Sequence, residues 1–272
     1  MIVSSNATAV AFRAGGEWFY ACHAFHAVAP TWTVLVSLLV FGFAIPYFLL
    51  GWFHYWLDVY LMNVHWSWFD CRLQTNVTPR HDHQHAPTNR QLLRQLVWVA
   101  LVAVTPFLYV FIVLRSPASF QCTPLRGWSE WIWELGFKGL VMGGLCNEVL
   151  FYATHRTMHV YPELYRRFHA LHHQWNAPVA WAAAYAHPVE VVVCDLLPMM
   201  AAPWVLNMHW QALFVWCVLG VFVSQIHHSG LRWPVMISGS SEQPEFHDEH
   251  HRLRVGNFGM TGLMDSLFGT RL

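Results

Sequence analysis

Long apolar runs alternate with polar stretches along this chain. Residues 31–53 and 96–114 contain no charged side chain. Each run is long enough to cross a bilayer as a helix, which takes about 20 apolar residues. The pattern therefore predicts two membrane-spanning helices in the first half of the chain, with a kink at Pro46 in the first of them.

Two further apolar runs are less regular. Residues 129–153 are interrupted by Glu134, Lys138 and Glu148, of which the first two can pair on one helix face because they are four residues apart. Residues 189–226 are broken by prolines, so they fit either a tight helical hairpin or a re-entrant pair. Together the runs predict an all-α integral membrane protein with about four transmembrane helices.

Composition agrees with this fold class. The chain is 56% hydrophobic and 11% charged, whereas soluble domains carry about 25% charged residues. Its net charge is zero and its basic residues form no long run, so nothing favours a nucleic-acid partner. The six cysteines form no CxxC pair, which argues against a cysteine zinc site. No linker, low-complexity tract or repeat divides the 272 residues, so we expect a single domain over residues 1–272.

The arginines predict which side of the membrane each loop faces. If the apolar runs cross the bilayer in order, residues 54–95, 154–188 and 227–272 lie on one side and carry 11 arginines, against three on the other side. Cytoplasmic loops are enriched in Lys and Arg, so this side is predicted to be the cytosol.

Histidines concentrate in three clusters on that side. They are HRTMH (His155, His159), HALHH (His169, His172, His173) and HDEHH (His247, His250, His251). Residues at i, i+3 and i+4 share a helix face, so each cluster can aim its imidazoles at one point. With 19 histidines in the chain, HxxHH is expected about 0.09 times by chance, and two copies therefore indicate a metal site.

The number of histidines predicts two metal ions. One tetrahedral zinc needs four ligands, yet the clusters supply eight, and His187 and His228 follow or precede apolar segments that return to the same side. Ten histidines suit two five-coordinate ions. Imidazole binds iron, zinc, copper and nickel, so the residues alone leave the metal open.

Other histidines have simpler explanations. His81, His83 and His85 in RHDHQH fit a solvated loop. Acidic residues near the clusters can accept the second ring N–H of a metal-bound histidine, as such partners usually do. Glu148, Glu190 and Asp265 are the expected second-layer residues, whereas Asp248 fits a helix cap equally well.

At this point the chain resembles the fatty acid hydroxylase and sterol desaturase superfamily of membrane di-iron enzymes. The resemblance covers about residues 130–272 and rests on the order HxxxH, HxxHH, a histidine before proline, a second HxxHH, then NFG and DSLFGT. Within the superfamily, APVAWAAAYAHPVE and HHSGLRWP are similar to the sterol C-4 methyl oxidase branch, with cholesterol 25-hydroxylase as a near relative.

The resemblance implies four membrane helices in two hairpins beneath a cytosolic helical cap that holds the histidine-rich di-metal site. It implies two Fe ions, which zinc can replace in a purified sample, and O2 with NAD(P)H-derived electrons as co-substrates. The electron donor would be a cytochrome b5-type or flavoprotein reductase. The family also implies residence in the endoplasmic reticulum.

We therefore expect a membrane oxidoreductase that hydroxylates an unactivated C–H bond of a lipid, with a sterol methyl group as the leading substrate. Desaturation, a cholesterol 25-hydroxylase-like reaction and hydroxylation of a fatty acyl or sphingolipid chain stay open, because the same site serves them all. A non-enzymatic metal-binding membrane protein is disfavoured. Transporters hold their ligands at mid-bilayer depth, whereas these clusters lie just outside the apolar runs.

Overall fold

The computed structural model describes residues 35–63, 88–115, 125–175, 178–232 and 243–272. The solvated loop predicted for His81, His83 and His85 lies outside these residues. Within them the chain is almost entirely helical, which confirms the predicted all-α class.

Most of the long helices combine α-helical and π-helical segments, so neighbouring segments form one continuous helix. In chain order, the segments that precede the histidine clusters are η1 (Leu38–Ala44), α4 (Ile45–Asn63), α5 (Asn89–Val99), η2 (Ala100–Val104), α6 (Thr105–Arg115), α7 (Trp128–Trp131) and η4 (Ile132–Gly143).

The remaining segments carry the clusters or pack against them. They are α8 (Gly144–Val160), α9 (Pro162–Leu164), η5 (Tyr165–His169), η6 (His172–Gln174), η7 (Ala180–Ala184), α10 (Pro188–Glu190), η8 (Val191–Leu196), α11 (Leu197–Val205), α12 (Trp210–His228), α14 (Gln243–Leu253) and α15 (Leu263–Phe268).

Four helices among the described residues are long and apolar enough to cross a membrane, as predicted. They are Leu35–Leu57, Asn89–Leu114, Pro188–Val205 and Trp210–His228. The run at 189–226 therefore forms two helices joined by a turn at Asn207, whose φ of 48° is left-handed. The helix formed by α7, η4 and α8 is not one of the four, although 129–153 was expected to span. Its charged residues lower its hydropathy.

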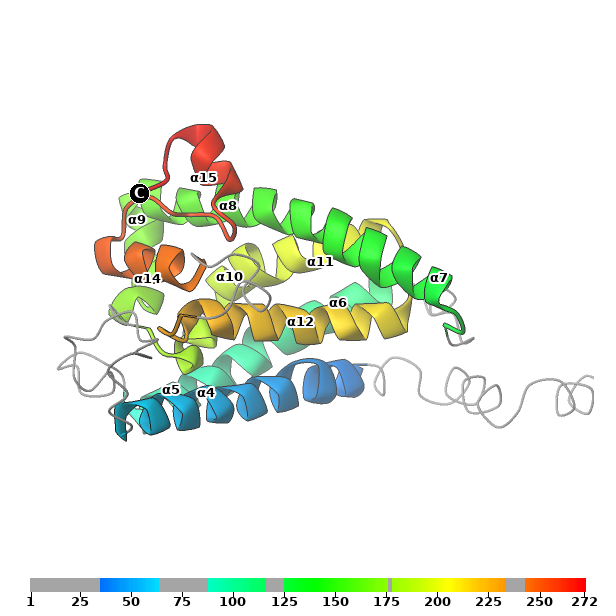
Figure 1. Cartoon of the computed structure of the whole chain (residues 1–272), viewed down its shortest axis with the longest axis horizontal. Coiled ribbons are helices and arrows are strands. Elements are labelled where there is room, and N and C mark those ends of the chain that lie inside the picture. The colour runs from blue at the N-terminus through cyan, green and yellow to red at the C-terminus, as the bar shows by residue number, and fades with distance from the viewer. Residues whose placement is uncertain (1–34, 64–87, 116–124, 176–177, 233–242) are drawn as a thin grey trace, which may run out of the picture.

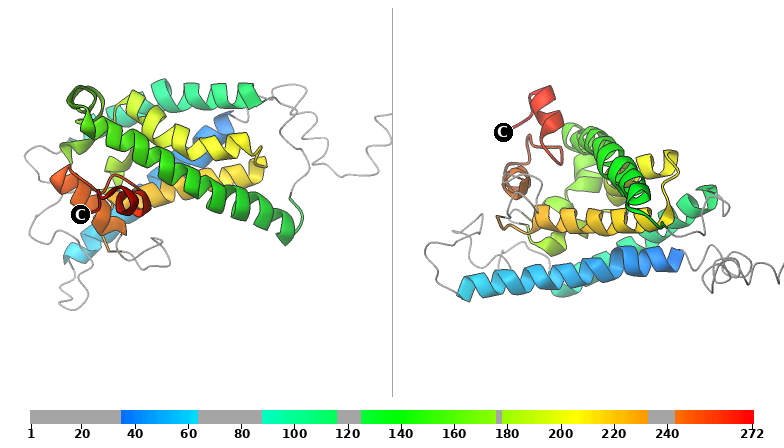
Figure 2. Two further views of the ribbon diagram at one scale, coloured as in Figure 1. Left: turned by 90° about the horizontal axis from the view of Figure 1, so that it is seen from above. Right: turned by 45° about the vertical axis from the view of Figure 1, so that its right-hand side comes forward.

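The long helices lie side by side, and the short helices gather at one end of them. In Figure 1, α9 and α14 lie at the left-hand end of the bundle, with α15 above α8. The views in Figure 2 show α14 and α15 against the same ends of α12 and α8. This arrangement is the helical cap that was expected over the spans.

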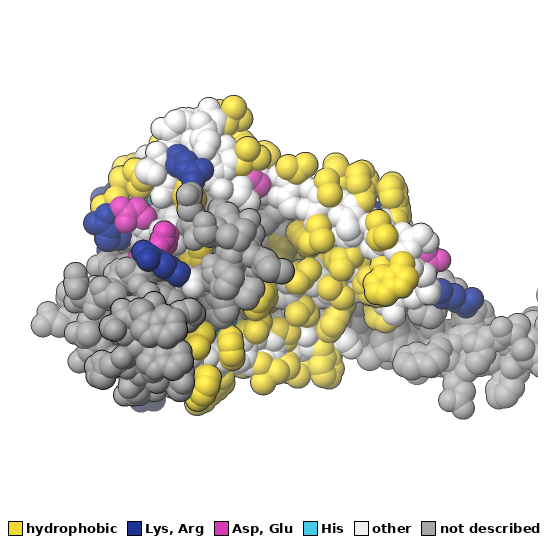
Figure 3. All heavy atoms as spheres, viewed as in Figure 1, with side chains coloured by type: hydrophobic (Ala, Val, Ile, Leu, Met, Phe, Trp, Pro, Cys, Tyr) yellow, Lys and Arg dark blue, Asp and Glu magenta, His cyan; other side chains and the backbone are white. Residues whose placement is uncertain are grey.

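The outer faces of the spans are apolar. Hydrophobic side chains cover much of the surface in Figure 3, whereas charged side chains gather mainly at the end where α14 and α15 lie. Leu49, Leu101 and Leu114 on the first two spans are each more than 60% exposed. Contiguous exposed apolar surface of this kind marks contact with lipid rather than water.

The core between the spans lies where α6, α11 and α12 meet. Leu108, Met208 and Leu213 are fully buried there. Near the cap, the spans are tied by hydrogen bonds: Tyr47 on α4 donates its hydroxyl to the carbonyl of Trp181 at 2.6 Å, and Gln225 on α12 donates to the carbonyl of Tyr47 at 2.8 Å. These contacts fix the end of the bundle that carries the histidines.

Candidate metal centre

Nine histidines converge in two groups at the cap end of the bundle. The ligand atoms within each group lie within 4.8 Å of one another, and the members are His155, His159, His169, His173 and His250 in group one and His172, His228, His247 and His251 in group two. All but His159 are buried. The groups are adjacent, since the rings of His173 and His251 are 4.7 Å apart between centroids.

Group one has the spacing of ligands around one ion. Its Nε2 atoms are separated by 3.1 Å between His155 and His169, 2.8 Å between His169 and His159, and 3.0 Å between His169 and His173. Two ligand nitrogens about 2.1 Å from one metal and at right angles to each other are about 3.0 Å apart. The geometry of group one therefore fits a single ion at the centre of the rings.

Group two has the same spacing with one ligand fewer. The Nε2 atoms are 3.3 Å apart between His228 and His172, 3.0 Å between His247 and His228, and 3.2 Å between His251 and His247. These rings come from η6, the end of α12 and α14, so three separate segments must meet to form the group.

Each HxxHH motif is divided between the two groups. His169 and His173 lie in group one and His172 in group two, whereas His247 and His251 lie in group two and His250 in group one. On the α-helix α14, with 3.6 residues per turn, i and i+4 differ in direction by about 40°, while i+3 points about 60° to the other side of i. In the first motif, His169 ends the π-helical segment η5 and the other two rings lie on the 3-10 segment η6. The expectation that one HxxHH motif aims its rings at one point was therefore wrong, because the i+3 ring lies in the neighbouring group.

The outer ring nitrogens show which tautomer is present. Nδ1 of each of five rings lies 2.7–2.9 Å from an acceptor oxygen. Four of these oxygens are backbone carbonyls, which can only accept: Phe258 O for His155, Ser224 O for His228, Gly256 O for His250 and Trp175 O for His251. The fifth is Glu190 Oε1, which as a carboxylate oxygen accepts from His169. Each Nδ1 must therefore carry the hydrogen, and a neutral ring then has a bare lone pair on Nε2.

Bare lone pairs that face each other need a cation between them. The Nε2 atoms of His155 and His169 are 3.1 Å apart, and neither has a hydrogen to donate. Full protonation does not resolve this, because burial lowers the pKa of His155 to about 4, and burial with neighbouring imidazoles lowers the pKa of His169 well below its usual value. The residues present therefore fit a bound metal ion in each group.

Glu190 contacts a ring directly, as expected of a second-layer acceptor. It follows the start of a span, is buried, and accepts from His169 Nδ1 at 2.7 Å through Oε1. Its other oxygen has no hydrogen-bond partner within the described part of the chain. The carboxylate therefore fixes the tautomer and orientation of a group-one ring.

Asp265 acts on the cluster through the backbone. Its carboxylate accepts from Phe258 N at 2.8 Å and Gly259 N at 2.7 Å. The carbonyl of Phe258 then accepts from His155 Nδ1. Asp265 thus holds the loop whose Phe258 carbonyl orients the ring of His155. It was expected to contact a ring itself, but the backbone of this loop lies between them.

Glu148 also binds backbone rather than a ring. Its carboxylate accepts from Met260 N at 3.1 Å, Thr261 N at 2.8 Å and Met264 N at 3.2 Å. Glu148 was expected to orient His155, seven residues later on the same helix. In the structure His155 Nδ1 donates to Phe258 O. The carboxylate instead anchors the C-terminal loop to α8.

His187 lies outside both groups. Its Nδ1 accepts from Val189 N at 3.1 Å, so the side chain caps the N-terminus of α10. A histidine before proline satisfies the spacing of a tenth ligand and also suits a helix cap, and local sequence does not separate the two. His227, left undecided by the sequence, is buried beside the site with its ring 6.2 Å from that of His247, outside both groups.

Sequence reasoning missed the backbone acceptors that surround the cluster. The turn VGNFG contributes two of them, Gly256 O and Phe258 O. Gly259 in the same turn has no room for a side chain, because a Cβ there would lie 2.8 Å from both Asp265 Oδ2 and Glu148 Oε1. The glycine-rich pattern was the available signal, but it indicated only a turn.

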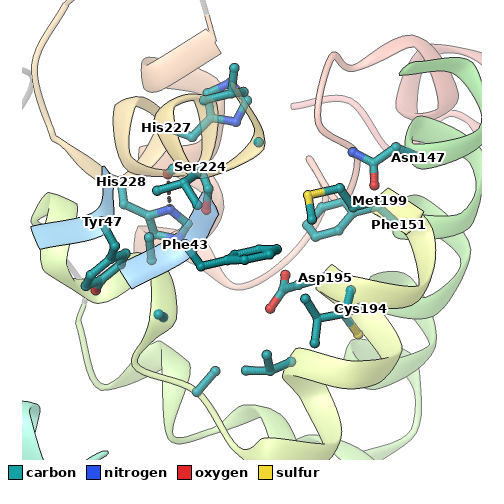
Figure 4. Close-up of a pocket in the computed structure, with 18 of the residues that line it drawn as sticks. Phe43, Tyr47, Asn147, Phe151, Cys194, Asp195, Met199, Ser224, His227 and His228 are labelled. Carbon is teal, nitrogen blue, oxygen red and sulfur yellow. Dashed lines mark hydrogen bonds between the residues drawn. The ribbon is translucent and has the colours of Figure 1, made fainter. Parts of the chain in front are cut away.

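A cavity of about 500 Å³ leads from between the spans to the histidines. Its walls are largely apolar, with Phe43, Leu96, Phe151 and Met199 among the lining residues. The rings that reach it are His155 and His169 of group one and His172, His228 and His247 of group two. Figure 4 shows this space enclosed by helices, with His228 on one side and Phe151 and Cys194 on the other. Both ion positions therefore border one apolar chamber.

Residues 140–270 match the family model described as fatty acid hydroxylase. This segment contains all nine converging histidines and the carboxylates that support them. This part of the chain therefore matches the fatty acid hydroxylase family, which confirms the resemblance drawn from the spacing of the histidines.

Curated relatives carry several kinds of name, of which three examples follow. The chain is similar to fatty acid hydroxylase domain-containing protein 2 from Macaca fascicularis, with 33% identity over 66% of this chain and 51% of the relative. It is 31% identical to fatty acid hydroxylase ahd1 from Mycosarcoma maydis over 46% of this chain and 31% of the relative. It is 28% identical to methylsterol monooxygenase 2-2 from Arabidopsis thaliana over 68% of this chain and 70% of the relative.

The chain spans about half or less of the length of the first two of these relatives. No solved structure matches it.

Proposed function

We propose that this protein is a membrane-bound di-iron oxygenase that hydroxylates an unactivated C–H bond of a lipid, with a sterol methyl group as the leading substrate. The observation that carries the proposal is the apolar cavity of about 500 Å³ whose wall includes rings of both histidine groups. A cavity of this size is in the range that encloses a small-molecule ligand.

The nine converging histidines would hold the two ions, five around one and four around the other. An all-nitrogen donor set suits iron and also accepts zinc. When bound, two iron ions would supply the redox chemistry by which O2 oxidises a C–H bond, with electrons that originate in NAD(P)H. Side chains alone have no oxidant for such a bond.

The chain's own residues orient the histidine rings and enclose the lipid. The backbone carbonyls and Glu190 keep the hydrogen of each partnered ring on Nδ1, so that Nε2 stays free to bind metal. The apolar wall excludes water from the site and binds the lipid by burial of its surface. The cavity lies between spans whose outer faces are apolar, so a lipid can reach it from the bilayer.

The sterol assignment is supported by a relative named methylsterol monooxygenase and by the chain's similarity to the sterol C-4 methyl oxidase branch. Hydroxylation of a fatty acyl chain is the second candidate, and the family description and the relative named fatty acid hydroxylase favour it. Both reactions would use the same metal site, and they differ in the lipid that the cavity accepts.

The proposal includes an electron donor and an orientation. A cytochrome b5-type protein or a flavoprotein reductase would deliver electrons at the cap, which would face the cytosol of the endoplasmic reticulum. Exposed charged side chains at that end, among them Arg166 and Arg252, offer a surface for such a partner.

The test uses the full-length protein in lipid nanodiscs with cytochrome b5, its reductase, NADH and isotopically labelled ¹⁸O2. We expect two metal ions per chain by elemental analysis, and a 4-methylsterol product that contains one labelled oxygen by mass spectrometry. A long-chain acyl lipid, assayed in parallel, distinguishes the second candidate. Iron-loaded protein that oxidises neither lipid would contradict the proposal.

A further inference from the structure

One acidic side chain in the cavity has no role in the metal centre. Asp195 lies on η8, within the span Pro188–Val205, and its carboxyl group points into the cavity (Figure 4). No hydrogen bond or ion pair links it to any of the residues that the structure describes. It neither caps a helix nor binds a histidine.

Several other polar groups labelled in this view have partners. Asn147 donates to Met260 Sδ at 2.7 Å, the Tyr47 hydroxyl donates to a backbone carbonyl, and the carbonyl of Ser224 accepts from His228. A carboxyl group that faces a largely apolar cavity from within a membrane-spanning helix is costly unless something pairs with it. An ionisable residue in such a position is therefore expected to meet a ligand.

We propose that Asp195 binds the polar end of the lipid substrate by accepting a hydrogen bond from a hydroxyl group. The inference rests on the proposed function and deepens it, because it names the class of lipid: a neutral alcohol. A free fatty acid or a phosphate-bearing lipid is disfavoured, since it would bring another acidic group beside the carboxyl group of Asp195.

The position of Asp195 also predicts where the lipid is oxidised. Asp195 follows Glu190 by five residues, which is about one turn of the π-helical segment η8, and Glu190 binds the ring of His169. A hydroxyl group held by Asp195 therefore lies close to group one. The oxidised carbon is expected near the polar end of the lipid, not at the far end of its chain.

The experiment measures binding without turnover. Full-length, metal-loaded protein in nanodiscs, without reductant, is titrated with a 4-methylsterol, with its 3-O-methyl ether, and with a long-chain alcohol and the matching fatty acid. The wild type should bind each alcohol at least about tenfold more tightly than the ether or the acid, because a hydrogen bond to a carboxylate is lost. Asp195→Leu should remove this preference. Asp195→Asn, whose amide oxygen still accepts, should keep part of it.

The control removes an acidic charge elsewhere. Glu163→Gln changes an exposed residue paired with Arg166, far from the cavity, and should leave the preference intact. Metal content and elution volume on size exclusion check that each variant is folded. If Asp195→Leu does not fold, the comparison of wild type with Asp195→Asn decides.

The outcomes separate this inference from the proposed function. A preference that depends on Asp195 in a protein that oxidises no lipid would support the inference and contradict the proposed function. Oxidation with an alcohol-to-ether ratio unchanged in the Asp195 variants would overturn the inference alone. Equal binding of alcohol and ether by the wild type, or tighter binding of the fatty acid, would also overturn it.

Discussion

The histidine cluster and the cavity beside it are built in opposite ways. In the cluster, many polar atoms are directed: ring nitrogens face one another at about 3 Å, and the outer nitrogens of five rings donate to carbonyls or to Glu190. In the cavity, most of the wall is apolar and non-directional, with the carboxyl group of Asp195 as an exception. In the proposed function, the cluster would therefore set the chemistry by the orientation of its rings, whereas the cavity would set the choice of lipid by its shape and one polar contact.

This difference predicts that mutations in the two regions impair different properties. A change in the cluster should reduce metal content together with activity. A change in the cavity wall should alter substrate preference while both ions stay bound. The following variants test that separation, in order of decreasing expected effect.

Removal of a converging ring should have the largest effect. His250→Ala takes away a group-one ring whose centroid is 4.6 Å from those of His155 and His159. We expect loss of at least one ion per chain and a loss of turnover beyond the roughly 100-fold typical of outer partners. Elemental analysis and ¹⁸O incorporation measure both. His187→Ala is the matched control and should keep both ions; equal metal loss in the two variants would show that the grouping is wrong.

Removal of the carboxylate behind a ring should weaken metal binding without abolishing it. Glu190→Ala leaves His169 Nδ1 without its acceptor, and we expect metal affinity to fall by about 10- to 100-fold in a chelator competition assay. Glu190→Gln should lose less, because its amide oxygen still accepts. An Ala variant with wild-type affinity would remove Glu190 from the metal centre.

A methyl group at the loop behind the cluster should destabilise the C-terminal segment. In Gly259→Ala the new Cβ would meet two carboxylate oxygens at 2.8 Å, and we expect a cost of about 1–3 kcal/mol in unfolding free energy. Thermal unfolding and hydrogen exchange over residues 258–272 measure it. Gly144→Ala is the control, since nothing lies within 4 Å of its Cβ. Similar melting temperatures for both variants would count against the packing argument.

Partial filling of the cavity should have the smallest effect and act only on substrate. Gly144 lines the cavity and has open space at its Cβ, so Gly144→Leu should project into the chamber without backbone strain. We expect kcat/KM for a sterol to fall about tenfold, with a smaller loss for a slender acyl lipid and unchanged metal content. A drop in metal content would show that cavity and cluster are not separable.

Local sequence predicted the elements of the fold well. The uncharged runs predicted the first two spans, and the run at 189–226 yielded two more once the turn at Asn207 was seen. The run at 129–153 was the exception. It forms a helix, but its Glu148 accepts from the backbone of a loop more than 100 residues later in the chain. A contact over that distance cannot be read from the residues around Glu148.

Local sequence also predicted most of the candidate site. Nine of the ten expected histidines converge, because i, i+3 and i+4 spacing is a property of the helix itself. His187 does not converge with them, since its Nδ1 accepts from Val189 N at the start of α10. The group to which each ring belongs depended on the docking of α14 against η6 and α12. The spacing within each motif had suggested that all its rings point to one place.

The sequence by itself determined that this chain is an all-helical membrane protein with histidines clustered outside its spans, because hydropathy and helix periodicity act between residues close in the chain. Only the tertiary structure decided the division of the rings between two ions, the carbonyls that orient them, and the cavity that Asp195 faces. Those features join segments that are far apart in sequence, and their positions follow from packing between helices rather than from any local pattern.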